Sequence, residues 1–121
     1  MEAVNLSVLR GAISGPPEIR ALESGSRIAT LAVRTSAGDG RNTSVPVTVW
    51  DPPAWLETLA ADDAVLVVGR VRRRFFRTAT GGSGVRTDVE AESLAPARDR
   101  RRLAALLRRV DRELERLDET E

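Results

Sequence analysis

The sequence predicts an all-β domain: a five-stranded barrel with a short helix between its third and fourth strands, plus a C-terminal amphipathic helix. Through the first 95 residues, alternating apolar and polar segments are separated by turns rich in glycine, proline and serine. Midway along, a proline pair carries the signals of a helix start. After residue 96 a helical period appears, without glycine or proline. We therefore expect residues 1–96 to form the barrel and residues 97–121 the helix.

The first half of the barrel is predicted from period-two alternation. In the clearest segment, residues 27–35, Ala29, Leu31 and Val33 share one face and polar residues fall mostly on the other. The turn signals are glycine, proline and serine clusters, which break strands. The expected segments are strands over residues 5–13, 27–35 and 43–50, and a short extended piece over 18–22.

A short helix is expected next. Residues 51–53, Asp-Pro-Pro, end the third strand, and a proline in the first turn is compatible with a helix start. Trp55, Leu56 and Leu59 would form the buried side of this helix, so all three are interpreted as core.

The last two strands complete the barrel. Residues 64–76 form a long strand whose centre, residues 66–68, is apolar enough to be buried on both faces. A glycine-rich tip at 80–84 leads back into a strand over 85–94. This order of elements is that of the OB-fold, a five-stranded Greek-key barrel.

An amphipathic helix is predicted over residues 98–117. Its apolar positions follow steps of four, three, four and three and make one stripe: Leu103, Leu107, Val110, Leu114 and Leu117. Three partners for this stripe stay open: the helix's own barrel, the same helix of a second subunit, or a different protein.

The residue types leave few routes to catalysis. Cysteine and histidine are absent, which excludes the usual zinc ligand sets and Ser–His or Cys–His pairs. Glu90 and Glu92 are interpreted as a solvated strand edge. We expect no enzyme activity, no metal and no cofactor. Neither a secretory leader nor a stretch approaching the roughly 20 apolar residues of a membrane span is seen, so a cytoplasmic protein without membrane contact is expected.

Two aromatic residues are predicted on the outside of the barrel. Alternation places Trp50 opposite the valines of its own strand. It places Phe76 on the same face as Arg72 and Arg74, whereas Phe75 is expected to pack inward. Exposed rings beside arginines form a platform for unpaired bases, worth on the order of 1–3 kcal/mol per base. Alternatively, both rings lie in a subunit interface or under a loop.

Arginine supplies every basic side chain of the protein, and four arginines fall within residues 72–77. Arg34, Arg72 and Arg74 are expected to project toward one groove, where guanidinium groups bind phosphates bidentately. An ordinary solvated face is the alternative. Residues 1–97 hold eleven arginines and eleven acidic residues, so only the distribution of charge can attract a nucleic acid. The predicted single-stranded DNA site is Trp50, Phe76, Arg72, Arg74 and Arg34; RNA would use the same chemistry.

Four segments carry a family resemblance. They are Val4-Asn5 with Val8-Leu9-Arg10-Gly11, Pro17-Glu18-Ile19-Arg20 with Ser24-Gly25, Ile28-Ala29 with Leu31-Ala32-Val33, and Gly69-Arg70-Val71-Arg72 through Arg74 and Phe76. In this order and spacing, the chain over about residues 4–95 resembles the bacterial single-stranded DNA-binding protein family. The resemblance implies a homotetramer of OB barrels paired through the first strand, with DNA around the outside.

The same resemblance assigns Trp50 and Phe76 to stacking sites, and Arg72 and Arg74 to basic positions. The sequence departs from the family at Ser44, where many members have another stacking tryptophan, and in a short loop without an aromatic residue. A charged helix also replaces the disordered segment with an acidic tip that ends in proline-phenylalanine.

Ser44 and the short loop suggest weaker binding or fewer nucleotides per subunit, and the helical end means that the family's recruitment of repair and replication enzymes is not transferred to this chain. We expect an auxiliary protein of DNA replication, repair or recombination that is cytoplasmic and nucleoid-associated. The alternative is an interaction or assembly module that uses the C-terminal helix and binds DNA weakly or not at all.

Overall fold

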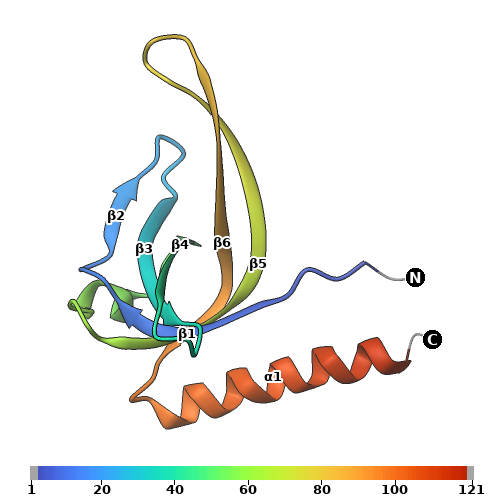
Figure 1. Ribbon diagram of the computed structural model, residues 1–121. Coiled ribbons are helices and arrows are strands. Elements are labelled where there is room, and N and C mark those ends of the chain that lie inside the picture. Colours follow the sequence, from blue (N-terminus) through green and yellow to red (C-terminus); the bar gives the residue numbers. More distant parts are fainter. Residues whose placement is uncertain (1–2, 120–121) are drawn as a thin grey trace.

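The computed structural model describes residues 3–119 and shows a closed barrel with one helix beneath it and a long two-stranded ribbon rising from it (Figure 1). The elements are β1 (Ser7–Ile13), β2 (Glu18–Ala21), β3 (Arg27–Ser36), β4 (Asn42–Trp50), the 3₁₀-helix η1 (Ala54–Thr58), β5 (Ala64–Arg77), β6 (Ser83–Pro96) and α1 (Arg100–Glu119). Every predicted element is present, and the extended piece after β1 is a strand of its own.

Five strands close the barrel in the order β1-β5-β6-β4-β3, because β3 also pairs with β1. The short strand β2 pairs with β3 beside this ring. The pairing of β4 with β6 is parallel, and the other pairings are antiparallel. The predicted five-stranded OB-fold barrel is therefore confirmed.

The barrel interior is filled by small β-branched side chains and closed at one end by η1. Leu56 and Leu59 are buried, as predicted. Leu56 lies within η1 and Leu59 is the extended residue that follows it, and both pack in the barrel core. Trp55 lies to the side and is only partly buried, with the guanidinium of Arg102 5.7 Å from its ring. Its assignment to the core was correct only in part.

The first half of α1 packs on its own barrel. Leu106 is buried, and Leu103 and Val110 pack beside it against Leu66 and Val68 of β5. The centre of β5 is thus covered on both faces, as predicted. Leu106, absent from the predicted stripe, is the most buried residue of the helix, whereas two predicted members stay about half exposed: Leu107 at 46% and Leu114 at 49%. Within residues 3–119, no helix combines the length and apolar character that a membrane crossing requires.

Beyond the barrel, β5 and β6 continue as a ribbon in which they pair with each other up to Arg77 and Ser83. Towards its tip the ribbon rises clear of the barrel (Figure 1). Phe75, on the inward side of β5, is consequently 77% exposed. The prediction that Phe75 packs inward is wrong because alternation gives a side chain's face but not where the barrel ends.

The ribbon's register depends on a bulge beside Gly69. Val68 pairs with Ser93 and Gly69 with Ala91, so Glu92 has no residue opposite it. A Cβ on Gly69 would lie 2.1 Å from the carbonyl oxygen of Glu90, so only glycine fits this approach of two backbones.

The Asn5 side chain fixes β5 just after this bulge. Its Nδ2 donates to the carbonyl oxygen of Val71 at 2.8 Å, and its Oδ1 accepts from the Val71 N–H at 2.9 Å. The Asn5 side chain thus makes the two hydrogen bonds to the Val71 backbone that a paired strand residue would make, and so extends the β1–β5 pairing.

Replacing Gly69 by alanine is expected to lower the free energy of unfolding by about 1–3 kcal/mol, because the added methyl overlaps backbone atoms that cannot move independently. Urea denaturation measures the change. The matched control is Gly15→Ala, where a Cβ has no heavy atom within 4 Å. Equal stability of the two variants would contradict this account of the bulge.

Candidate nucleic-acid interface

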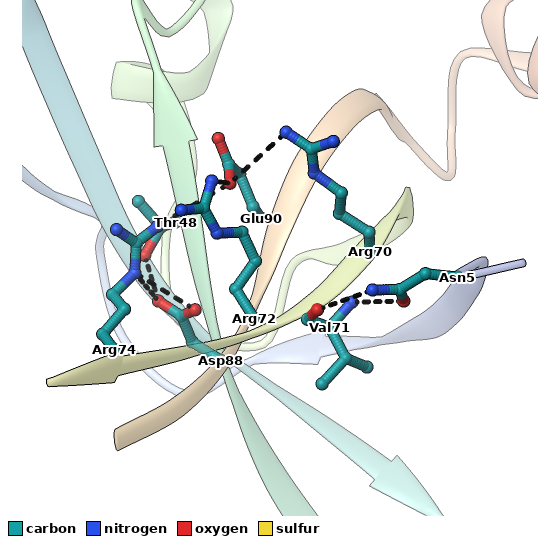
Figure 2. A network of polar contacts seen from close by, with 8 residues as sticks. All are labelled: Asn5, Thr48, Arg70, Val71, Arg72, Arg74, Asp88 and Glu90. Carbon is teal, nitrogen blue, oxygen red and sulfur yellow. Dashed lines mark hydrogen bonds and ion pairs between the residues drawn. The ribbon is translucent and has the colours of Figure 1, made fainter. Parts of the chain in front are cut away.

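Three arginines and two carboxylates alternate on the outer side of the ribbon's base (Figure 2). Arg70, Arg72 and Arg74 project from β5 at every second position, so they share one face. Because of the bulge at Gly69, Arg70 pairs with Glu90 and Arg72 pairs with Asp88 on β6. Strand alternation and the shifted register together bring the opposite charges into contact.

Asp88 is the anchor of this cluster. Its side chain is 2% exposed, and a buried carboxylate is stable only when it is paired and hydrogen-bonded. Thr48 Oγ1 on β4 donates to Asp88 Oδ2 at 2.7 Å. Arg74 Nε donates to the same oxygen at 3.1 Å and lies 3.3 Å from Oδ1. These contacts tie β4, β5 and β6 together and hold the Arg74 guanidinium in one orientation.

Glu90 lies between all three guanidinium groups. It forms an ion pair with Arg72, and its Oε2 is 3.9 Å from Nη2 of both Arg70 and Arg74. The Nη2 of Arg74 is buried and makes no hydrogen bond with any described residue. Since 3.9 Å is beyond hydrogen-bond range, Glu90 does not satisfy that donor. The cluster has three guanidinium groups and two carboxylates, so one positive charge is left over.

The acidic residues of β6 differ from the sequence interpretation. Glu90 has only 14% of its side chain exposed, so it is no solvated edge residue. Glu92 does not share its face, because Glu92 is the extra residue of the bulge; it lies 3.9 Å from Arg109 of α1. Alternation alone cannot reveal a bulge, since one extra residue reverses every later side chain.

The two predicted stacking residues are exposed: Trp50 by 43% and Phe76 by 48%. Phe76 lies opposite Gly84, close enough that a Cβ there would be 2.4 Å from the ring's Cζ. On β4, Thr48 pairs with Glu90 of the parallel strand β6, and Trp50 lies two residues further along β4. Measured along β6, the backbone positions of the two residues are therefore about 26 Å apart at the usual rise per strand residue, with the arginine cluster between them.

Arg34 does not join the other predicted residues. It lies opposite Ser44 on β4, and its Nη2 donates to Asp62 Oδ1 at 2.8 Å, in the loop before β5. The structure thus brings Arg72 and Arg74 together and directs Arg34 to another loop.

The ribbon's other face carries a feature that the sequence interpretation missed. Phe75 lies opposite Val85, which is 49% exposed, and the Arg73 guanidinium is 5.8 Å from the centre of the Phe75 ring. The length of β5 could have predicted this exposed face. With 14 residues, β5 is longer than the 7- to 10-residue strands β1, β3 and β4 of the barrel and must extend past them.

The barrel has the OB fold, and it is similar to solved structures of single-stranded DNA-binding proteins. It is similar to the crystal structure of a deletion variant of the single-stranded DNA binding protein from Thermus aquaticus, with a TM-score of 0.64 and 26% identity. The wild-type form of that protein matches with a TM-score of 0.63 and 24% identity. Each match covers 77% of this chain and 40% of the other, so this chain spans less than half the length of the proteins it resembles.

No protein-family model matches the sequence, and no curated protein matches it either.

Changing Thr48 to valine is expected to destabilise the fold by about 1–3 kcal/mol, because the buried Asp88 carboxylate loses a donor. Chemical denaturation gives the free energy of unfolding. Thr30→Val is the control, since Thr30 pairs with Thr48 on the neighbouring strand but is no partner of Asp88. If Thr48→Val is as stable as the control, Asp88 does not depend on this bond.

Proposed function

We propose that the protein binds single-stranded DNA without sequence preference along the outer face of β4, β6 and β5. One observation carries the proposal: Trp50 and Phe76 are both exposed, with a cluster of arginines between them. Stacking on exposed rings accepts any base, because every base has a π-face. The similarity to the Thermus aquaticus protein, named for single-stranded DNA binding, supports the same ligand.

In this proposal each ring stacks one base, and Arg72 and Arg74 contact phosphates between them. Because the rings are far apart, a DNA segment that reaches both must be several nucleotides long. This length is within the usual site size of about 4–16 nucleotides per OB fold. Arg34 can contribute only by leaving Asp62, so its share is expected to be smaller. Because the residues up to 97 carry equal numbers of arginines and acids, stacking must supply much of the affinity.

An auxiliary role in DNA replication, repair or recombination is part of the same proposal. RNA offers the same bases and phosphates, so competition between RNA and DNA oligomers decides which nucleic acid is preferred.

Trp50→Ala and Phe76→Ala are each expected to weaken binding to poly-dT by about 1–3 kcal/mol, through loss of one stacked base. Fluorescence anisotropy with labelled dT oligomers measures this loss. Phe75→Ala is the matched control: the same residue type, adjacent and more exposed, but on the ribbon's other face. Binding unchanged by the Trp50→Ala, Phe76→Ala double variant would refute the proposed surface.

Tryptophan fluorescence separates the DNA-binding face from the rest of the molecule. The protein has two tryptophans, Trp50 on the proposed interface and Trp55 beside Arg102 of α1. Poly-dT is expected to quench the emission of the wild type but not that of Trp50→Phe, whose signal comes from Trp55. Equal quenching of both proteins would place the DNA elsewhere.

Self-association through α1 is a second proposal, favoured by the uncovered edge of the helix at Leu107 and Leu114. Residues 100–109 contain five arginines and no acid, whereas residues 110–119 contain five acids and two arginines. Two copies of α1 that pair antiparallel would place the basic half of each against the acidic half of the other, with Leu107 against the partner's Leu114. A tetramer needs a further contact, which the family resemblance assigns to β1.

The Leu107→Ser, Leu114→Ser double variant is expected to halve the mass measured by light scattering, because it removes the apolar centre of the paired helices. Val85→Ser, an exposed apolar residue on the ribbon, is the control and is expected to keep the wild-type mass. A wild-type protein that is monomeric at all concentrations would overturn the helix pairing.

A further inference from the structure

We infer that Glu90 is an internal competitor of nucleic-acid phosphates, which occupies the arginine cluster in the free protein and lowers its affinity for single-stranded DNA. This inference rests on the proposed DNA-binding function and identifies the residue that sets its strength.

The position of Glu90 is that of a bound anion. Its carboxylate is paired with Arg72 and lies 3.9 Å from Nη2 of Arg70 and of Arg74, so it is approached by all three guanidiniums of the outer face (Figure 2). Carboxylate and phosphate oxygens accept the same charge-assisted bonds from a guanidinium fork. An arginine that holds Glu90 is therefore less available to a phosphate.

The two acidic residues of the cluster have different roles. Asp88 is deeply buried and accepts a hydrogen bond from Thr48 as well as from Arg74, so it supports the sheet. Among the described residues, the Glu90 carboxylate forms hydrogen bonds and ion pairs with arginines only. Removing the charge of Glu90 therefore frees arginines without removing a structural anchor.

The three arginines around Glu90 are accessible to a ligand. Their side chains are 48%, 42% and 30% exposed for Arg70, Arg72 and Arg74, whereas that of Glu90 is 14% exposed. A phosphate that takes Arg72 leaves a mostly buried carboxylate with fewer cations, which is unfavourable. DNA binding bears this cost at each occupied arginine, and a variant without the Glu90 charge does not.

The test compares Glu90→Gln with Glu92→Gln by titration with dT oligomers at several salt concentrations. Both changes remove one negative charge from β6, but Glu92 is 47% exposed and lies near Arg109, outside the cluster. We expect Glu90→Gln to bind dT oligomers about tenfold more tightly than the wild type does. The affinity of Glu92→Gln is expected to exceed that of the wild type by no more than about twofold. The dependence of log affinity on log salt should steepen by about 0.7 for each additional phosphate that the freed arginines neutralise.

Two further variants separate competition from folding effects. Glu90→Asp keeps the charge but withdraws it by one methylene, and is also expected to bind more tightly. Arg72→Gln should cost more affinity in the Glu90→Gln background than in the wild type, since only there is Arg72 fully available.

The outcomes distinguish this inference from the proposed function. If the wild type binds and Glu90→Gln, shown to be folded by circular dichroism, binds equally or more weakly, Glu90 does not compete and the inference fails while DNA binding stands. If neither protein binds, the proposed function fails and the inference with it. Tighter binding that is matched by Glu92→Gln reflects net charge alone and also overturns the inference.

Discussion

The buried carboxylate of Asp88 is the contact on which the outer face of the protein depends. It joins β4 to β5 and β6 through Thr48 and Arg74, at the level where the ribbon leaves the barrel. A charge in this position is tolerated only with its partners in place, so it fixes where three strands meet. Arg74 owes its orientation to this contact, and the register of the neighbouring side chains follows from the bulge at Gly69 just below.

Strand β5 serves two purposes along one face. Its first part is apolar on the outer side and is covered by α1 through Leu66 and Val68, whereas its second part carries the arginines and ends in Phe76. The helix thus covers the apolar part of the strand and leaves the charged part accessible. This division explains why the chain can keep an exposed aromatic and basic surface beside a well-buried second core.

The sequence predicted the fold well because period-two alternation and turn residues are local signals. It also predicted that Trp50 and Phe76 are exposed, since alternation sets the face of a side chain. It could not predict the ion pairing of Arg72, the separate position of Arg34, or the exposure of Phe75. Those depend on a bulge at Gly69, on a loop contact with Asp62 and on the height at which the barrel ends.

The order of charges along α1 has a consequence for how the protein folds. A helix is favoured by acidic residues in its first turn and basic residues in its last, and α1 begins with three arginines and has acids throughout its second half. This order of charges disfavours the 20-residue helix on its own, and in proteins most of the stability of a helix comes from packing of its apolar face. Its helicity therefore depends on docking at Leu106, and helix and barrel should form and melt as one cooperative unit.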